Sequence, residues 1–303
     1  LVLMAAACMT GDDDKKVEKL PESSGMKNEI IIFKGQRNRY DKAFETSGAK
    51  LVEFGSLENV TEKDLVNSIT SQTCAVAYVI MPFSKKGIGL KKTIEIAHKY
   101  NIPVILDAAA EVPPRSNLSK FINMEVDMVA FSGGKGIGGP QSTGILAGKE
   151  KFISAAFKNS LNLHSSIACI GRPMKVSKEN IVGLVTAIEL YMDGDEQFEY
   201  KSWRNKSEYI VNKLKGIPNL KILIEDTPTD RQGPQPVLYF ERNWNGKSPE
   251  KIRQEMIEED PPIYLGIGGN TTGFRGEINI VMTNVMDGEE KIIAERLNRI
   301  LRE

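Results

Sequence analysis

The sequence predicts an α/β protein in which a large domain with a mostly parallel sheet precedes a small α+β domain. Between residues 28 and 148, apolar runs typical of strands alternate with helical stretches. Most of these runs lack the alternation of apolar and polar residues that a sheet with one exposed face would show, so helices are expected on both faces. A chain of 303 residues accommodates one large and one small domain. We place the large domain at residues 1–175, and a connecting helix with the small domain at 176–303.

Each expected element follows from its local pattern. In the large domain, strands are expected at 29–34, 49–54, 74–80, 104–108, 127–131 and 143–147, with helices at 61–69 and 90–100. In the small domain, helices are expected at 178–192, 198–215, 249–258 and 289–301, and strands at 220–224, 237–240, 263–265 and 278–282. The opening LVLMAAACM is too short to span a membrane, and we interpret it as the end of a buried helix in an N-terminally truncated chain.

Charge and cysteine content restrict the function classes. The 40 Lys and Arg residues balance 40 Asp and Glu residues, so the chain has no general attraction for nucleic acid or an anionic membrane. The three cysteines form no C-x-x-C pair and there are two histidines, so we expect neither a disulfide framework nor a metal site. A cytoplasmic protein is the expectation that follows.

The stretch from 104 to 148 carries the chemistry. Asp107 ends one buried apolar strand, and Lys135 follows another in a loop of small residues. Strand ends in parallel sheets meet at the ligand crevice, so the acid and the amine are expected to converge there. A partly desolvated lysine is a nucleophile towards carbonyl groups, and pyridoxal phosphate requires such a lysine together with an acid beside its ring nitrogen. The glycines around Lys135 suggest that a bulky group approaches the backbone.

Three other interpretations of this stretch compete. Gly134, Gly136 and Gly139 satisfy G-x-G-x-x-G, but a dinucleotide fingerprint opens a helix, whereas a strand is expected after Pro140. A P-loop requires Ser or Thr after the lysine, where this chain has glycine. In the structural interpretation, Asp107 is a helix cap and Lys135 is a solvated loop residue.

Several segments resemble one family of pyridoxal-phosphate enzymes. VILDAAAEVPP at 104–114 and VAFSGGKGIGGPQSTG at 129–144 are similar to the family of selenocysteine synthase (L-seryl-tRNA selenium transferase) and D-glucosaminate-6-phosphate ammonia-lyase. Residues 171–192 resemble the ammonia-lyase branch, and segments 5–11 and 25–41 also resemble the family. The resemblance implies the aspartate-aminotransferase-like fold (PLP fold type I), with a seven-stranded sheet, in a homo-oligomer. It also implies that an N-terminal turn binding the coenzyme phosphate is missing here, so that the chain binds the coenzyme poorly.

The resemblance also assigns roles to individual residues. Lys135 is expected to hold pyridoxal 5'-phosphate as a Schiff base, and Asp107 to pair with its ring nitrogen. Ala109 is expected against the ring and Ser132 at the phosphate, with Gln141 as a further neighbour.

Basic residues after the lysine loop suggest a second feature. Arg172, Lys175 and Lys178 recur at a spacing of three, which on a helix places them on one face and makes an anion site for the substrate. A solvated helix start explains the same spacing equally well. His164, Arg37, Arg39, Tyr40 and Arg275 are weaker candidates for contacts in the site.

Three functions remain open. The first is a lyase that eliminates a β-substituent from a small amino acid or amino-sugar acid such as D-glucosaminate 6-phosphate. The second is selenium transfer to seryl-tRNA, against which the neutral charge counts. The third is an inactive truncated homologue that retains the fold.

Overall fold

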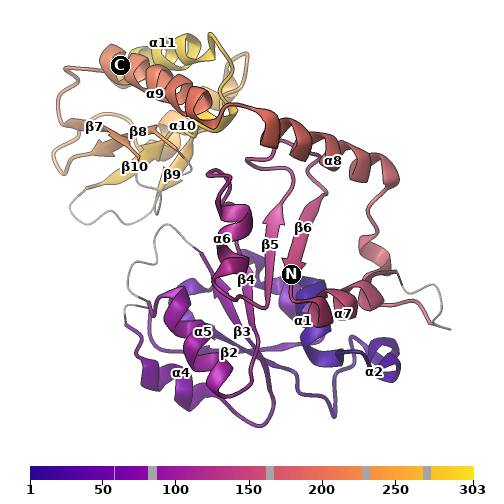
Figure 1. The fold of residues 1–303 in the computed structure, drawn as a ribbon. Coiled ribbons are helices and arrows are strands. Elements are labelled where there is room, and N and C mark those ends of the chain that lie inside the picture. Colours follow the sequence, from indigo (N-terminus) through magenta and orange to yellow (C-terminus); the bar gives the residue numbers. More distant parts are fainter. Residues whose placement is uncertain (58, 81–86, 162–166, 227–232, 269–273) are drawn as a thin grey trace. The chain divides into compact units, whose positions relative to one another are not determined.

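The computed structural model describes residues 1–57, 59–80, 87–161, 167–226, 233–268 and 274–303. The chain divides into two compact units, Leu1–Asp193 and Gly194–Glu303 (Figure 1). In the described residues, no helix is both long enough and apolar enough to cross a lipid bilayer.

The first unit is built on a six-stranded sheet. Its strands are β1 (Glu29–Phe33), β2 (Lys50–Phe54), β3 (Thr73–Val79), β4 (Val104–Asp107), β5 (Met128–Ser132) and β6 (Gly144–Gly148). The order is β2-β1-β3-β4-β5-β6, and only β6 runs antiparallel among these six. The expected strands are confirmed to within one residue at each end. The resemblance implied seven strands, and the described residues of this unit form six.

Helices cover both faces of this sheet. They are α1 (Val2–Thr10), α2 (Asp14–Lys19), α3 (Lys42–Thr46), α4 (Glu62–Ser68), α5 (Leu90–Lys99), α6 (Asn117–Asn123), α7 (Glu150–Leu161) and α8 (Lys178–Asp193). In β1, Ile30 and Ile32 pack into a core cluster with α1 and α7, whereas Ile31 packs into the opposite cluster with α5. Burial of successive residues on opposite faces explains why the strands are apolar throughout. Figure 1 shows α1 and α7 side by side, apart from α4 and α5.

The second unit packs three helices on a small antiparallel sheet. Its elements are α9 (Glu196–Lys213), β7 (Leu220–Glu225), β8 (Gln235–Phe240), α10 (Pro249–Glu258), β9 (Gly266–Gly268), β10 (Gly276–Asn279) and α11 (Glu289–Arg302), with strand order β7-β8-β10-β9. The prediction of a strand at 263–265 is wrong. Ile263 donates its N–H to the Met256 carbonyl of α10, and Leu265 is apolar because it packs in the core. The strand expected at 278–282 begins earlier and ends at Asn279.

The boundary between the two compact units falls after helix α8, at 193/194, rather than before it. Leu184, Ala187 and Ile188 of α8 pack against the core of the first unit. The division into functional domains at 175/176 remains a prediction.

A charged cluster ties together the amino edge of the large sheet. The side chain of Asp127 is 5% exposed and lies 2.6 Å from Nζ of Lys149 and 2.7 Å from Nε2 of His98. The N–H of Val104 also donates to this carboxylate, at 2.8 Å. Burial alone would raise the pKa of Asp127, but the hydrogen bonds from Lys149, His98 and Val104 outweigh it and lower that pKa.

We expect Asp127→Asn to destabilise the first unit by about 2–4 kcal/mol, because a buried carboxylate with three partners is lost. The pKa of Asp127 is lower in the folded than in the unfolded chain. The stabilisation is therefore present above the unfolded value and is lost as the pH falls through the folded one. Urea unfolding at pH 7 and at low pH measures both effects. Asp12→Asn is the matched control, because the Asp12 side chain is 90% exposed in its pair with Lys158. An equal loss in both variants contradicts the prediction.

Candidate active site

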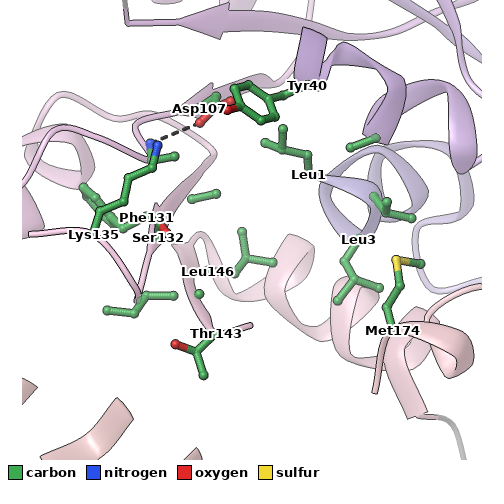
Figure 2. A pocket seen from close by; sticks show the side chains of 16 residues that line it. Leu1, Leu3, Tyr40, Asp107, Phe131, Ser132, Lys135, Thr143, Leu146 and Met174 are labelled. Carbon is green, nitrogen blue, oxygen red and sulfur yellow. Dashed lines mark hydrogen bonds between the residues drawn. The ribbon is translucent and has the colours of Figure 1, made fainter. Parts of the chain in front are cut away.

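Residues from several strands meet at the carboxyl edge of the large sheet. Asp107 and Ser132 end β4 and β5, and Gly144 begins the antiparallel β6 at the same edge. They surround a cavity of about 490 Å³. Its lining comprises Leu1, Val2, Leu3, Tyr40, Ala43, Asp107, Ala109, Ala130, Phe131, Ser132, Lys135, Thr143, Gly144, Ile145, Leu146 and Met174 (Figure 2). The predicted residues Lys135, Asp107, Ala109 and Ser132 are therefore all in one cavity.

The carboxylate of Asp107 is held by the chain that follows it. Asp107 is 8% exposed, and its Oδ1 accepts the backbone N–H of Ala109 at 3.1 Å (Figure 2). Within the described residues, this is the one hydrogen bond given to its side chain. The interpretation of Asp107 as a helix cap is wrong, because α6 begins ten residues later with Ser116 at its N-cap. The second carboxylate oxygen of this buried acid is thus available to a ligand.

The glycines of the lysine loop serve the packing of the chain itself. A Cβ at Gly136 would lie 2.0 Å from the carbonyl oxygen of Val112, and one at Gly133 would lie 2.1 Å from Oγ1 of Thr143. A Cβ at Gly139 would lie 3.1 Å from Leu184 of α8. The idea that the glycines admit a bulky ligand is therefore wrong at these positions, because neighbouring protein atoms fill the space.

The loop agrees with one further expectation and differs from another. It runs into strand β6, so the dinucleotide interpretation of its glycines is excluded. The side chain of Lys135 is exposed, so the partial desolvation expected for it is absent in this chain. Its position at the cavity, rather than its burial, distinguishes Lys135 from a surface lysine.

Four of the predicted site residues do not line the cavity. Gln141 is exposed, and its Nε2 donates to the carbonyl of Gly134 at 2.8 Å, which braces the lysine loop. Arg172, Lys175 and Lys178 are exposed. They do not share one helix face, because Arg172 lies in a 3-10 turn, Lys175 is extended with ψ 124°, and α8 begins only at Lys178. Arg172 and Lys175 nevertheless flank Met174, which lines the cavity.

The weaker candidates lie elsewhere or are committed to other contacts. His164 falls outside the described residues. Arg37 is paired with Asp41 at 2.5 Å and with Glu53 at 2.6 Å, whereas Tyr40 lines the cavity and is 62% exposed. Arg275, in the second unit, donates to the carbonyl of Trp244. Among the residues that the structure describes, no three His, Cys, Asp or Glu side chains are grouped to hold a metal ion.

Sequence reasoning missed Glu111. This acid is half-buried beside the site, and its burial raises its pKa to about 7. The positive charges of Lys120 and Lys135 act in the opposite direction, and the negative charge of Asp107 adds to the increase. The available signal in the sequence was the position of Glu111, four residues after Asp107 in a turn rich in alanine and proline.

Comparison with known proteins shows the family to which the chain belongs. The profile of the L-seryl-tRNA selenium transferase family matches residues 26–202, which is more than half of the sequence. The chain belongs to this family. It is 28% identical over 273 residues to 5'-C-glycyluridine monooxygenase-decarboxylase of Streptomyces sp, covering 88% of this chain and 65% of the relative. It is 34% identical over 200 residues to D-glucosaminate-6-phosphate ammonia lyase of Salmonella typhimurium, covering 64% and 51%.

The fold is shared with solved structures of related enzymes. A structure of D-glucosaminate-6-phosphate ammonia-lyase superposes with a TM-score of 0.76 at 26% identity, over 99% of this chain and 78% of that one. The two curated relatives named above are longer than this chain, which spans about half to two thirds of their length. Enzymes of the selenium transferase family and of this fold depend on pyridoxal 5'-phosphate and include lyases and transferases.

The cavity fits that coenzyme. It offers the Lys135 amine for the aldehyde and the buried Asp107 carboxylate for a protonated ring nitrogen. Its walls are largely apolar, as a flat aromatic ring requires, and include Phe131, Leu3 and Leu146. The donor set and the lining of this cavity therefore agree with the family.

We expect Gly136→Ala to destabilise the first unit by about 2–4 kcal/mol, since the added Cβ would lie 2.0 Å from a backbone oxygen that cannot rotate away. Thermal unfolding of the purified chain measures this loss. Gly89→Ala is the matched control, because a Cβ at Gly89 has no heavy atom within 4 Å and its φ is −60°. Equal melting temperatures for the two variants would show that the loop is not packed as described.

Glu111→Gln is expected to change the pH dependence of stability. Burial raises the pKa of Glu111 from 4.5 to about 7, so its ionisation disfavours the folded state. The wild-type chain therefore loses stability as the pH rises from the unfolded value through the folded one, and the amide does not. The difference in melting temperature, variant minus wild type, should be larger at pH 8 than at pH 5. A difference that is independent of pH contradicts the raised pKa.

Proposed function

We propose that the chain is a pyridoxal-phosphate-dependent lyase that removes an α-proton and eliminates a β-substituent from a small amino acid or amino-sugar acid. The observation that carries this proposal is the meeting of Lys135 and Asp107 in one cavity at the carboxyl edge of the sheet. Membership of the L-seryl-tRNA selenium transferase family supports it.

The roles of the residues follow from their chemistry. When bound, the coenzyme supplies an electron sink for the charge that develops at the substrate's α-carbon. Lys135 would hold the coenzyme through its amine, and this amine, when free, would take the α-proton of the substrate. The same group, then an ammonium, would return the proton to the departing β-hydroxyl, which leaves as water. Hydrolysis of the resulting enamine would then give a 2-keto acid and ammonia. Asp107 would keep a proton on the ring nitrogen, Ala109 would contact the ring and Ser132 would hold the phosphate, while Gln141 braces the loop.

The substrate class is the least constrained part of the proposal. The names of three relatives specify glycyluridine, glucosaminate 6-phosphate and seryl-tRNA, and each of these contains an amino-acid unit. Arg172, Lys175 and Lys178 would bind an anionic group on the substrate. In support of this role, the first two flank the cavity residue Met174, and none of the three has an ion pair within the described residues. An amino-sugar acid phosphate such as D-glucosaminate 6-phosphate meets both requirements.

Selenium transfer to seryl-tRNA is the second candidate. The family profile favours it, and it begins with the same elimination. The zero net charge counts against an extensive RNA-binding surface. We further propose that the chain acts in the cytoplasm, as its cysteine content suggests, and that it forms a homo-oligomer, as the family resemblance implies.

To test the proposal, the purified protein is loaded with pyridoxal phosphate and D-glucosaminate 6-phosphate is then added. The absorbance of the coenzyme and the release of ammonia are followed together. Lys135→Ala should abolish both the protein-bound absorbance band and the ammonia. Asp107→Asn should retain the band and lower ammonia release at least about a hundredfold. Lys213→Ala, which removes an exposed lysine of α9, is the control. A normal band without ammonia rejects this substrate, and seryl-tRNA is then tested. A band that survives Lys135→Ala overturns the role of Lys135.

A further inference from the structure

One face of helix α8 packs against the first unit and fixes the helix in place. Leu184, Ala187 and Ile188 lie on the core of that unit. Nδ2 of Asn180 donates to Oγ of Ser142 at 2.7 Å, just before strand β6 begins. These contacts set the orientation of α8, and with it the residues that face away from the sheet.

The opposite face of α8 exposes an apolar stripe. Its members are large apolar side chains that are about half exposed or more: Ile181 (52%), Val182 (65%), Val185 (49%) and Met192 (52%). Residues at these spacings share one face of a helix. The largest apolar patch on a soluble monomer is typically about 300–600 Å² and often binds a partner. Four neighbouring side chains with this exposure make a patch of that order.

Charged residues at the two ends of the stripe have opposite signs. Lys178 lies at its amino end, whereas Glu189 and Asp193 lie towards its carboxyl end. All three are exposed, and none forms an ion pair in the part of the chain that the structure describes. A second copy of the same helix in the antiparallel direction would bring each lysine to the acids of its neighbour. The two helix dipoles would also oppose each other, which favours this direction.

We propose that α8 forms the centre of a twofold interface between two copies of this chain, with the two helices antiparallel and Val185 near the axis. A twofold contact uses the same patch on both copies, so the patch must be complementary to itself. Lys178 lies seven residues before Val185 and Met192 seven residues after it, so these two residues would face each other. Glu189 and Asp193 are within one turn of Met192 and therefore within reach of that lysine.

This interface rests on the homo-oligomer proposed above and names its surface. It also separates the roles of the three basic residues that precede and begin α8. Lys178 would pair with the acids of the second copy. Arg172 and Lys175, which flank the cavity residue Met174, would remain for the substrate anion.

The experiment measures the mass of the purified chain by light scattering over a range of protein concentrations. Wild type should be a dimer or a larger even-numbered assembly. Val185→Asp should raise the dissociation constant at least about a hundredfold, because two carboxylates would be buried together near the axis. Phe157→Asp is the matched control, since it changes a side chain of α7 that is 75% exposed, and it should leave the mass unchanged. Both substitutions are at exposed positions, and circular dichroism checks that each variant is folded.

Reversal of the charges tests the direction of the helices. Lys178→Glu alone and Asp193→Lys alone should each raise the dissociation constant about three- to tenfold, because each twofold contact contains the pair twice. The double variant should recover most of this loss, since the reversed pair is complementary again. Losses that simply add in the double variant contradict the antiparallel arrangement.

Cross-linking tests the position of the axis. Val185→Cys should give a covalent dimer with a short bismaleimide, because the two copies of residue 185 would face each other. Phe157→Cys and the wild type, in which Cys74 and Cys169 are buried, should give little. A monomeric wild type overturns both this interface and the proposed homo-oligomer. A dimer that survives Val185→Asp overturns the interface alone, and ammonia release tests the lyase chemistry separately.

Discussion

Close packing of the lysine loop against neighbouring backbone is the constraint on which the site depends. Gly133, Gly136 and Gly139 lie where a side chain would strike Thr143, Val112 or Leu184. The loop is thereby held between the segment after β4 and helix α8, and this packing sets where Lys135 emerges. The same contact links the two chemical groups of the cavity, because the segment after β4 directly follows Asp107. A displacement of the loop would change the lysine and the surroundings of the aspartate together.

Charge is distributed differently at the two edges of the large sheet. At the amino edge, Asp127 is fully engaged with Lys149 and His98, and its role is to stabilise the fold. At the carboxyl edge, Asp107 has one backbone hydrogen bond and Glu111 has none to its carboxyl group in the described chain. Groups that are incompletely paired are the ones that remain able to bind a ligand or exchange a proton.

Much of the fold and part of the site were predictable from sequence, for different reasons. The strands of the large sheet were predicted closely because continuous apolar runs reflect burial on both faces, as Ile31 and Ile32 show. The prediction of a strand at 263–265 was wrong because Leu265 is apolar on account of its place in the core. The apolar pattern of a sequence does not distinguish a buried loop residue from a buried strand residue. Lys135 and Asp107 were found from motif and spacing. Glu111 was not, because its raised pKa arises from tertiary burial.

The antiparallel direction of β6 has a consequence for divergence within the family. Because β5 ends and β6 begins at the same edge, the chain from 133 to 143 leaves the sheet and re-enters it beside its point of departure. An insertion or deletion in this segment leaves the register of every strand unchanged. The sheet therefore does not fix the length of this segment, and its close packing against Val112, Thr143 and Leu184 is what restricts its length and composition.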